Sequence, residues 1–98
     1  MKEVIKLSAP IKAHDEEVTQ LELRRPTVVE VRKLKSLPYK IDAEDAVAVD
    51  MDVAAKYIAL CGHIPSSSVD QLDLADLNNA AWKIVGFFMK PASAPSTS

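Results

Sequence analysis

The chain has 98 residues, 48% of them apolar, and a formal net charge of −2. This length allows one domain with one modest core, and it excludes a multidomain enzyme with separate cofactor and substrate modules. A single cysteine, Cys61, excludes an internal disulfide framework, and no apolar run approaches the roughly 18 residues of a membrane span, so we expect a soluble cytoplasmic protein.

The N-terminal quarter predicts a β-hairpin. Residues 3–7 and 17–24 alternate between apolar and polar side chains, and Leu21 and Leu23 share one face of the second segment. Residues 8–16 between them contain a proline and a polar cluster, which predicts a rather long loop. Two strands alone are marginally stable, so we expect helices to cover their apolar face.

A helix is predicted directly after this hairpin. Pro26 ends the second strand, and Thr27 and Glu30 have the T-x-x-E spacing of a capping box, in which each side chain accepts a hydrogen bond from a free N–H at the helix start. The helix should run to about Leu37, because Pro38 follows. Its apolar stripe would consist of Val28, Val31, Leu34 and Leu37.

The middle of the chain is less regular. Residues 39–50 fit an irregular connection, a short strand or part of a helix, and these alternatives stay open. A helix should follow, capped by Asp50 or Asp52 and stopped at Gly62. A short helical turn is predicted at residues 69–72. The apolar side of the helix would be formed by Val53, Tyr57 and Leu60.

The last helix has the clearest pattern. Asp73 is a good N-cap, and Asp76 lies favourably at the positive end of the helix dipole. The expected core face consists of Leu74, Leu77, Ala81, Ile84, Val85 and Phe88. Trp82 and Met89 fall on the flank of this face, and Phe87 falls well away from it. Clustered exposed apolar groups are typical of partner sites, with cover by another part of the chain as the alternative.

These elements predict a small α+β domain over residues 1–90, with the N-terminal hairpin packed on three or four helices. Residues 91–98 contain two prolines and no charged or bulky side chain, which predicts a disordered tail. The fold class leaves room for a modest core and for little else.

The residues that could carry catalysis are few. Cys61 and His63 are the only thiol and imidazole close in sequence, and they lack the flanking context of known nucleophile motifs, so we interpret them as a core residue and a surface histidine. With His14 they do not have the spacing of a metal site. The acids of residues 42–52 lack the glycine and closing glutamate of a calcium loop. We therefore expect no enzyme, no metal and no cofactor.

The charge is unevenly distributed along the chain. Residues 1–40 hold nine Lys/Arg against six Asp/Glu, and residues 41–98 hold three against eight. Within the first part, five cations lie close together and could contact phosphates, but we favour a solvated face because no aromatic residue interleaves with them. They are Arg24, Arg25, Arg32, Lys33 and Lys35.

Taken in order, these motifs resemble one family. The run L-E-L-R-R-P-T-x-x-E-x-R-x-L at residues 21–34, preceded by Pro10 and Ile11, is similar to the opening of the small tail assembly chaperones of Mu-like and related contractile-tailed phages and prophages. Ile64 and Pro65 follow, and V-G-F-F at residues 85–88 resembles the end of that family's closing helices. The resemblance covers roughly residues 4–89, although residues 36–49 are longer and more acidic than the usual family connection.

The resemblance implies a non-enzymatic role. Family members bind the tape measure protein, a long helical chain that sets tail length, and keep it soluble in the host cytoplasm until tube subunits polymerise around it. They are absent from the mature virion. It also leaves open two further partners, a frameshifted longer form of the chain and a homo-oligomer.

We expect the contact with the tape measure protein to involve both apolar and basic side chains. The basic ones would add orientation and association rate more than affinity. The alternative is a small nucleic-acid-binding regulator that uses the basic helix after Pro26. The predicted contact residues are Trp82, Phe87, Phe88, Met89, Arg24, Arg25, Arg32 and Lys33.

Overall fold

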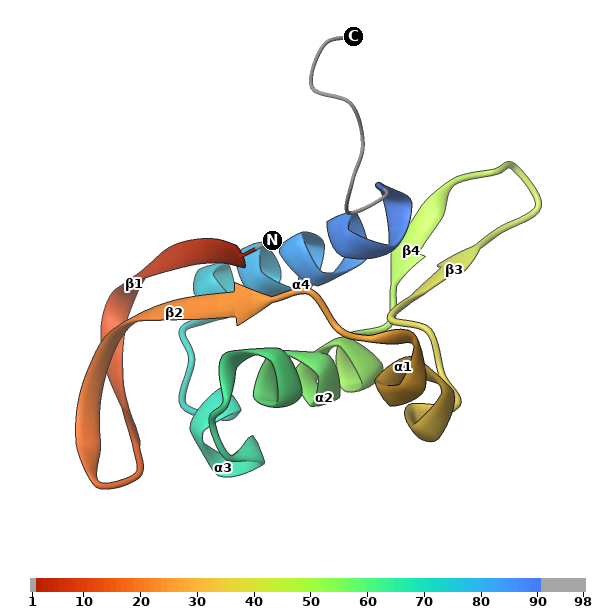
Figure 1. The fold of residues 1–98 in the computed structure, drawn as a ribbon. Helices are drawn as coiled ribbons and strands as arrows, with labels where there is room; N and C mark the ends of the chain where they lie inside the picture. The colour runs from red at the N-terminus through yellow and green to blue at the C-terminus, as the bar shows by residue number, and fades with distance from the viewer. Residues whose placement is uncertain (1, 91–98) are drawn as a thin grey trace, which may run out of the picture.

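In the computed structural model, which describes residues 2–90, a long curved β-hairpin lies over a pair of helices (Figure 1). The hairpin consists of β1 (Lys2–Ala13) and β2 (Glu16–Arg24), and the helices are α2 (Met51–Gly62) and α4 (Leu74–Met89). β2 packs on α2 and β1 packs on α4. The predicted α+β fold is confirmed, and the predicted disordered tail, 91–98, lies outside the described residues.

Four shorter elements complete the domain. α1 (Val28–Leu34) follows the long hairpin, and a second antiparallel hairpin of β3 (Tyr39–Ile41) and β4 (Val47–Val49) projects from the fold (Figure 1). This hairpin occupies the segment that the sequence left open. α3 (Ser66–Val69) comes between α2 and α4 in chain order. It begins three residues before the helical turn expected from the sequence.

The prediction of a long loop in the first hairpin is wrong. β1 continues through Pro10 to a two-residue turn at His14 and Asp15, whose φ values of 53° and 62° fit the hairpin turn that matches strand twist. Pairing shifts register between Lys6 and Ile11. Pro10 lies inside this bulge, where its missing N–H removes no ladder hydrogen bond. The polar segment of residues 8–16 therefore forms a β-bulge and a tight hairpin turn in place of a long loop.

A buried carboxylate fastens this bulge to the start of α4. Oδ2 of Asp76 accepts hydrogen bonds from the backbone N–H of Ser8 at 2.9 Å and from its hydroxyl at 3.0 Å. Asp76 is buried, and it joins α4 to β1 in addition to making the helix-dipole interaction expected from the sequence. The first turn of α4 thereby satisfies a backbone group of the irregular part of β1.

The core lies between the hairpin and the two long helices. The buried residues of α2 and α4 differ from the apolar faces that the sequence predicted for these helices. On α2, Val53 and Leu60 are only partly buried. On α4, Leu74 is 82% exposed and Phe87 is 4% exposed. α4 contacts both β1 and α2, so its buried arc is wider than the single stripe assumed from the sequence. The fully buried helix side chains include Ala54, Tyr57, Ile58, Cys61, Ala80, Ala81 and Ile84.

The predicted helix caps are confirmed at three places. Thr27 and Glu30 form the reciprocal capping box of α1, and Asp50 and Asp73 cap α2 and α4. α1 nevertheless ends at Lys35, which adopts the left-handed conformation with φ 58°, and so stops short of Leu37. No residue of α1 is fully buried.

Candidate partner-binding surface

An apolar groove lies between α1 and the C-terminal end of α4, and we call it the α1–α4 groove. Its volume is about 310 Å³. One wall consists of side chains from α1 and the turn after it, and the other consists of two phenylalanines at the end of α4. The lining residues are Arg25, Pro26, Val28, Val31, Arg32, Leu37, Phe87 and Phe88.

The α1 wall of the groove is unusually open to solvent. Val28 is 75% exposed and Leu37 is 47% exposed, whereas Val31 and Leu34 pack against the core. These residues were expected to form one apolar stripe, and the structure divides them into an inner pair and an outer pair. The outer pair is available to a partner, which the sequence analysis did not recognise.

Arg24 fixes the position of α1. Its guanidinium makes a bidentate ion pair with Glu30, with N–O distances of 2.8 and 2.7 Å. A carboxylate oxygen of Glu30 also accepts the N–H of Thr27 at 2.9 Å. The Arg24 hydrogen bonds, followed by the Thr27 amide, lower the pKa of Glu30 to about 2. Arg24 therefore supports the groove wall through a partly exposed ion pair, a structural role that the sequence did not indicate, and its predicted contact with a partner stays a prediction.

The other predicted cations divide into one structural residue and two free ones. Arg25 donates from Nη1 to the carbonyl of Lys90 at 2.8 Å, which ties the end of β2 to the end of α4. Over residues 2–90, neither Arg32 nor Lys33 takes part in an ion pair. α1 is only seven residues long, and two of the four predicted cations are engaged within the fold, so the basic surface is smaller than the nucleic-acid alternative assumed; that alternative stays a prediction.

The predicted aromatic cluster is not one surface. Trp82 is 47% exposed and Met89 is 46% exposed, whereas Phe87 is buried, which contradicts its expected exposure. The ring of Phe88 is partly buried and packs edge-on against Tyr57, with ring centroids 5.4 Å apart. Phe87 lines both the α1–α4 groove and a second hollow beside Trp82, so it separates the two.

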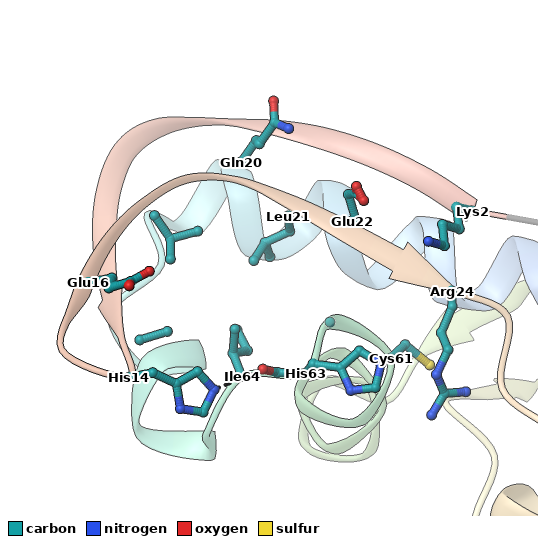
Figure 2. Close-up of a pocket in the computed structure, with 13 residues that line it drawn as sticks. Lys2, His14, Glu16, Gln20, Leu21, Glu22, Arg24, Cys61, His63 and Ile64 are labelled. Carbon is teal, nitrogen blue, oxygen red and sulfur yellow. Dashed lines mark hydrogen bonds between the residues drawn. The ribbon is translucent and has the colours of Figure 1, made fainter.

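The hollow that contains the only cysteine lies under β2, beside the end of α2 (Figure 2). It has a volume of about 490 Å³. Cys61 is fully buried, and burial raises the pKa of its thiol to about 11. Nε2 of His14 lies 3.1 Å from the backbone carbonyl of His63. These are the properties of a structural thiol in its protonated form and of one histidine ring, that of His14, held at a backbone carbonyl.

Two further observations concern metals and membranes. Among residues 2–90, no three His, Cys, Asp or Glu side chains are grouped as a metal site would require. None of the helices in the described part of the chain is both long enough and apolar enough to span a bilayer.

Arg24→Ala is expected to lower the free energy of unfolding at pH 7 by about 1 kcal/mol, since a half-exposed bidentate pair is lost. The folded-state pKa of Glu30 is depressed, so its contribution is complete above pH 4.5 and is lost as the pH falls toward 2. The difference between wild type and variant should therefore shrink between pH 5 and pH 2. Urea titrations across this range measure it, with Lys56→Ala on the exposed face of α2 as the control. A difference that is constant with pH would contradict the assignment.

Comparison with known proteins gives one match. Residues 4–89 match the family model described as phage tail assembly chaperone proteins, E, or 41 or 14. No curated protein and no solved structure matches the chain. The matched region contains the first hairpin except for the first two residues of β1, the whole second hairpin, the helices α1 to α4 and both walls of the α1–α4 groove.

Proposed function

Because the chain belongs to the phage tail assembly chaperone family, we propose that it binds a phage tape measure protein and keeps it soluble until the tail tube polymerises. We also propose that it has no enzymatic activity, acts in the host cytoplasm and is absent from the finished virion. The observation that carries the proposal is the exposed α1–α4 groove. It gives the chaperone an apolar surface that a helical client can cover.

The groove suits the side chains of a helix better than a small ligand. A client helix presents apolar side chains at positions i, i+3, i+4 and i+7, and these insert into a groove one after another. Val28 and Leu37 form the exposed apolar rim, and Arg32 adds a charge beside it. A surface with few deep anchors gives moderate affinity, which suits a chaperone that is later displaced.

A second strip of α4 extends this contact surface. Trp82, Gly86 and Met89 lie on one side of the helix, because they are spaced four and three residues apart. A glycine inside a helix costs about 0.5–1 kcal/mol relative to alanine. Within residues 2–90, a Cβ added at Gly86 would meet nothing within 4 Å, so packing among these residues does not require the glycine. Close approach of a client backbone beside Trp82 supplies a reason for it.

Co-expression with the tape measure protein tests this function. We expect the client to remain largely in the soluble fraction and to co-purify with the chaperone at an approximately fixed ratio. Expressed alone, or with an unrelated soluble domain of similar size, the client should be mostly insoluble, since its apolar helix faces are uncovered. No co-purification together with no gain in client solubility would overturn the proposal.

A further inference from the structure

The hairpin of β3 and β4, residues 39–49, has an apolar face that no other part of residues 2–90 covers at its outer end, and we call this hairpin the arm. Tyr39 pairs with Val49, and Ile41 pairs with Val47, so these four side chains share one face. The inner pair is partly buried, and Tyr39 contacts Phe88 edge-on at 6.1 Å between ring centroids. In the outer pair, Ile41 is 59% exposed and Val47 is 37% exposed. A two-stranded hairpin is marginally stable in water, so cover over this face would stabilise it.

The arm and the α1–α4 groove carry opposite charges. The turn of the arm holds three exposed acids, Asp42, Glu44 and Asp45, and none of them forms an ion pair within residues 2–90. The groove is lined by Arg25 and Arg32, and two lysines that follow Arg32 closely in the chain, Lys33 in α1 and Lys35 at its C-cap, are exposed. Each surface thus combines exposed apolar side chains with charges that complement the other.

The two surfaces are neighbours at one end of the molecule, where α1, the arm and the last turn of α4 meet (Figure 1). Phe88 lines the groove and also contacts the base of the arm. The arm does not fold onto its own groove, because the N–H of Asp50 donates to the carbonyl of Pro38 at 2.9 Å and fixes the base of the arm. When two copies are related by a two-fold axis, the arm of each copy can contact the groove of the other at the same time.

We propose that two copies of this chain form a closed dimer in which the arm of each copy lies in the α1–α4 groove of the other. Ile41 and Val47 provide the buried apolar contact, and the acids of the arm face Arg32 and the adjacent lysines of α1. The charge pairs act twice in each dimer, since the interface is reciprocal.

This dimer gives the groove a second occupant. If the groove also binds the client, which rests on the function proposed above, client and second copy compete for it. A free chaperone would then shield its apolar groove until a client arrives. The dimer itself is measured on the chain alone, so its failure and a failure of client binding are separate results.

Charge reversal tests the dimer. The groove variant carries Arg32→Glu and Lys33→Glu, and the arm variant carries Glu44→Lys and Asp45→Asn. Asp42 is kept because its Oδ1 accepts two N–H groups of the arm turn, and asparagine at position 45 tolerates the left-handed backbone there. Each variant alone should remain a single chain. In the groove variant, acids meet acids at both contacts, and in the arm variant the arm turn loses its net negative charge and brings a new cation against the basic groove. Mixed in equal amounts, the two should form dimers, because one contact is then the wild-type pair of acidic arm and basic groove, and at the other the new cation of the arm variant meets the acids of the groove variant.

Light scattering with size-exclusion chromatography at about 100 μM chain and low salt gives the mass. Wild type should show twice the chain mass of 10.7 kDa, and so should the controls Lys56→Glu and Glu22→Lys, which change charge elsewhere. Circular dichroism confirms that all variants are folded. A wild-type monomer, dimers of either variant alone, or no dimer in the mixture would overturn the proposal. A mass above two chains would overturn the closed geometry.

Discussion

The double substitution Val28→Asp and Leu37→Asp is expected to abolish retention of the tape measure protein while leaving the domain folded. Both side chains are exposed at the rim of the α1–α4 groove, at 75% and 47%. Client binding would bury two carboxylates among apolar groups, which costs several kcal/mol without a compensating partner. We expect affinity to fall by at least about a hundredfold, which corresponds to about 2.7 kcal/mol. Pull-down and calorimetric titration with a client segment measure the loss.

The matched control for this experiment is Leu74→Asp. Leu74 is 82% exposed at the start of α4 and does not line the groove, so this substitution places one aspartate, against two in the double variant, at another exposed apolar position. It should retain the client with unchanged affinity. The double variant should keep a wild-type melting temperature, because aspartate at the first position of α1 is favourable to the helix dipole. Equal loss of binding in variant and control would show that the groove has no special role.

The helix caps could be predicted from the sequence because they depend on neighbouring residues. Thr27 and Glu30 satisfy each other's backbone N–H across three residues, and Asp50 and Asp73 act on the same short scale. The path of β1 could not be predicted in this way. Its bulge at Pro10 is held by Asp76, 68 residues from Ser8 in sequence, and no local pattern reports that contact.

The candidate surface could be predicted only in part, because some of its features follow from local sequence patterns and others depend on distant contacts. Trp82 and Met89 were placed on the flank of the α4 core face from the helical period alone, with cover by another part of the chain left open, and both side chains are about half exposed. The ion pair of Arg24 with Glu30 was not predicted, because it requires the turn between β2 and α1 to bring the two residues together. The sequence placed Val28 and Leu37 in the apolar stripe of α1. It did not show which residues of that stripe α2 and the hairpin would leave uncovered. Exposure of this kind depends on the final packing.

Phe87→Ala is expected to lower the free energy of unfolding by about 3–5 kcal/mol, whereas Trp82→Ala should lower it by at most about 1 kcal/mol. Phe87 is 4% exposed and belongs to the core cluster, so its removal leaves a cavity. Trp82 is 47% exposed, so water and neighbouring side chains can occupy the vacated space. A domain of this size is stable by only about 5–15 kcal/mol, so the first variant should show a large shift of its urea midpoint.

The opposite ranking holds for binding, and it separates the core role from the contact role. Trp82→Ala should weaken client retention in a fully folded protein. The conservative variant Phe87→Leu keeps most of the buried volume, so it should recover most of the stability lost in Phe87→Ala. Because Phe87 is 4% exposed, this variant should change client binding less than Trp82→Ala does. Urea titration and pull-down on the three variants give both readouts. Similar stability losses for Phe87→Ala and Trp82→Ala would contradict the placement of Phe87 in the core, since burial is the only difference on which the two expectations depend.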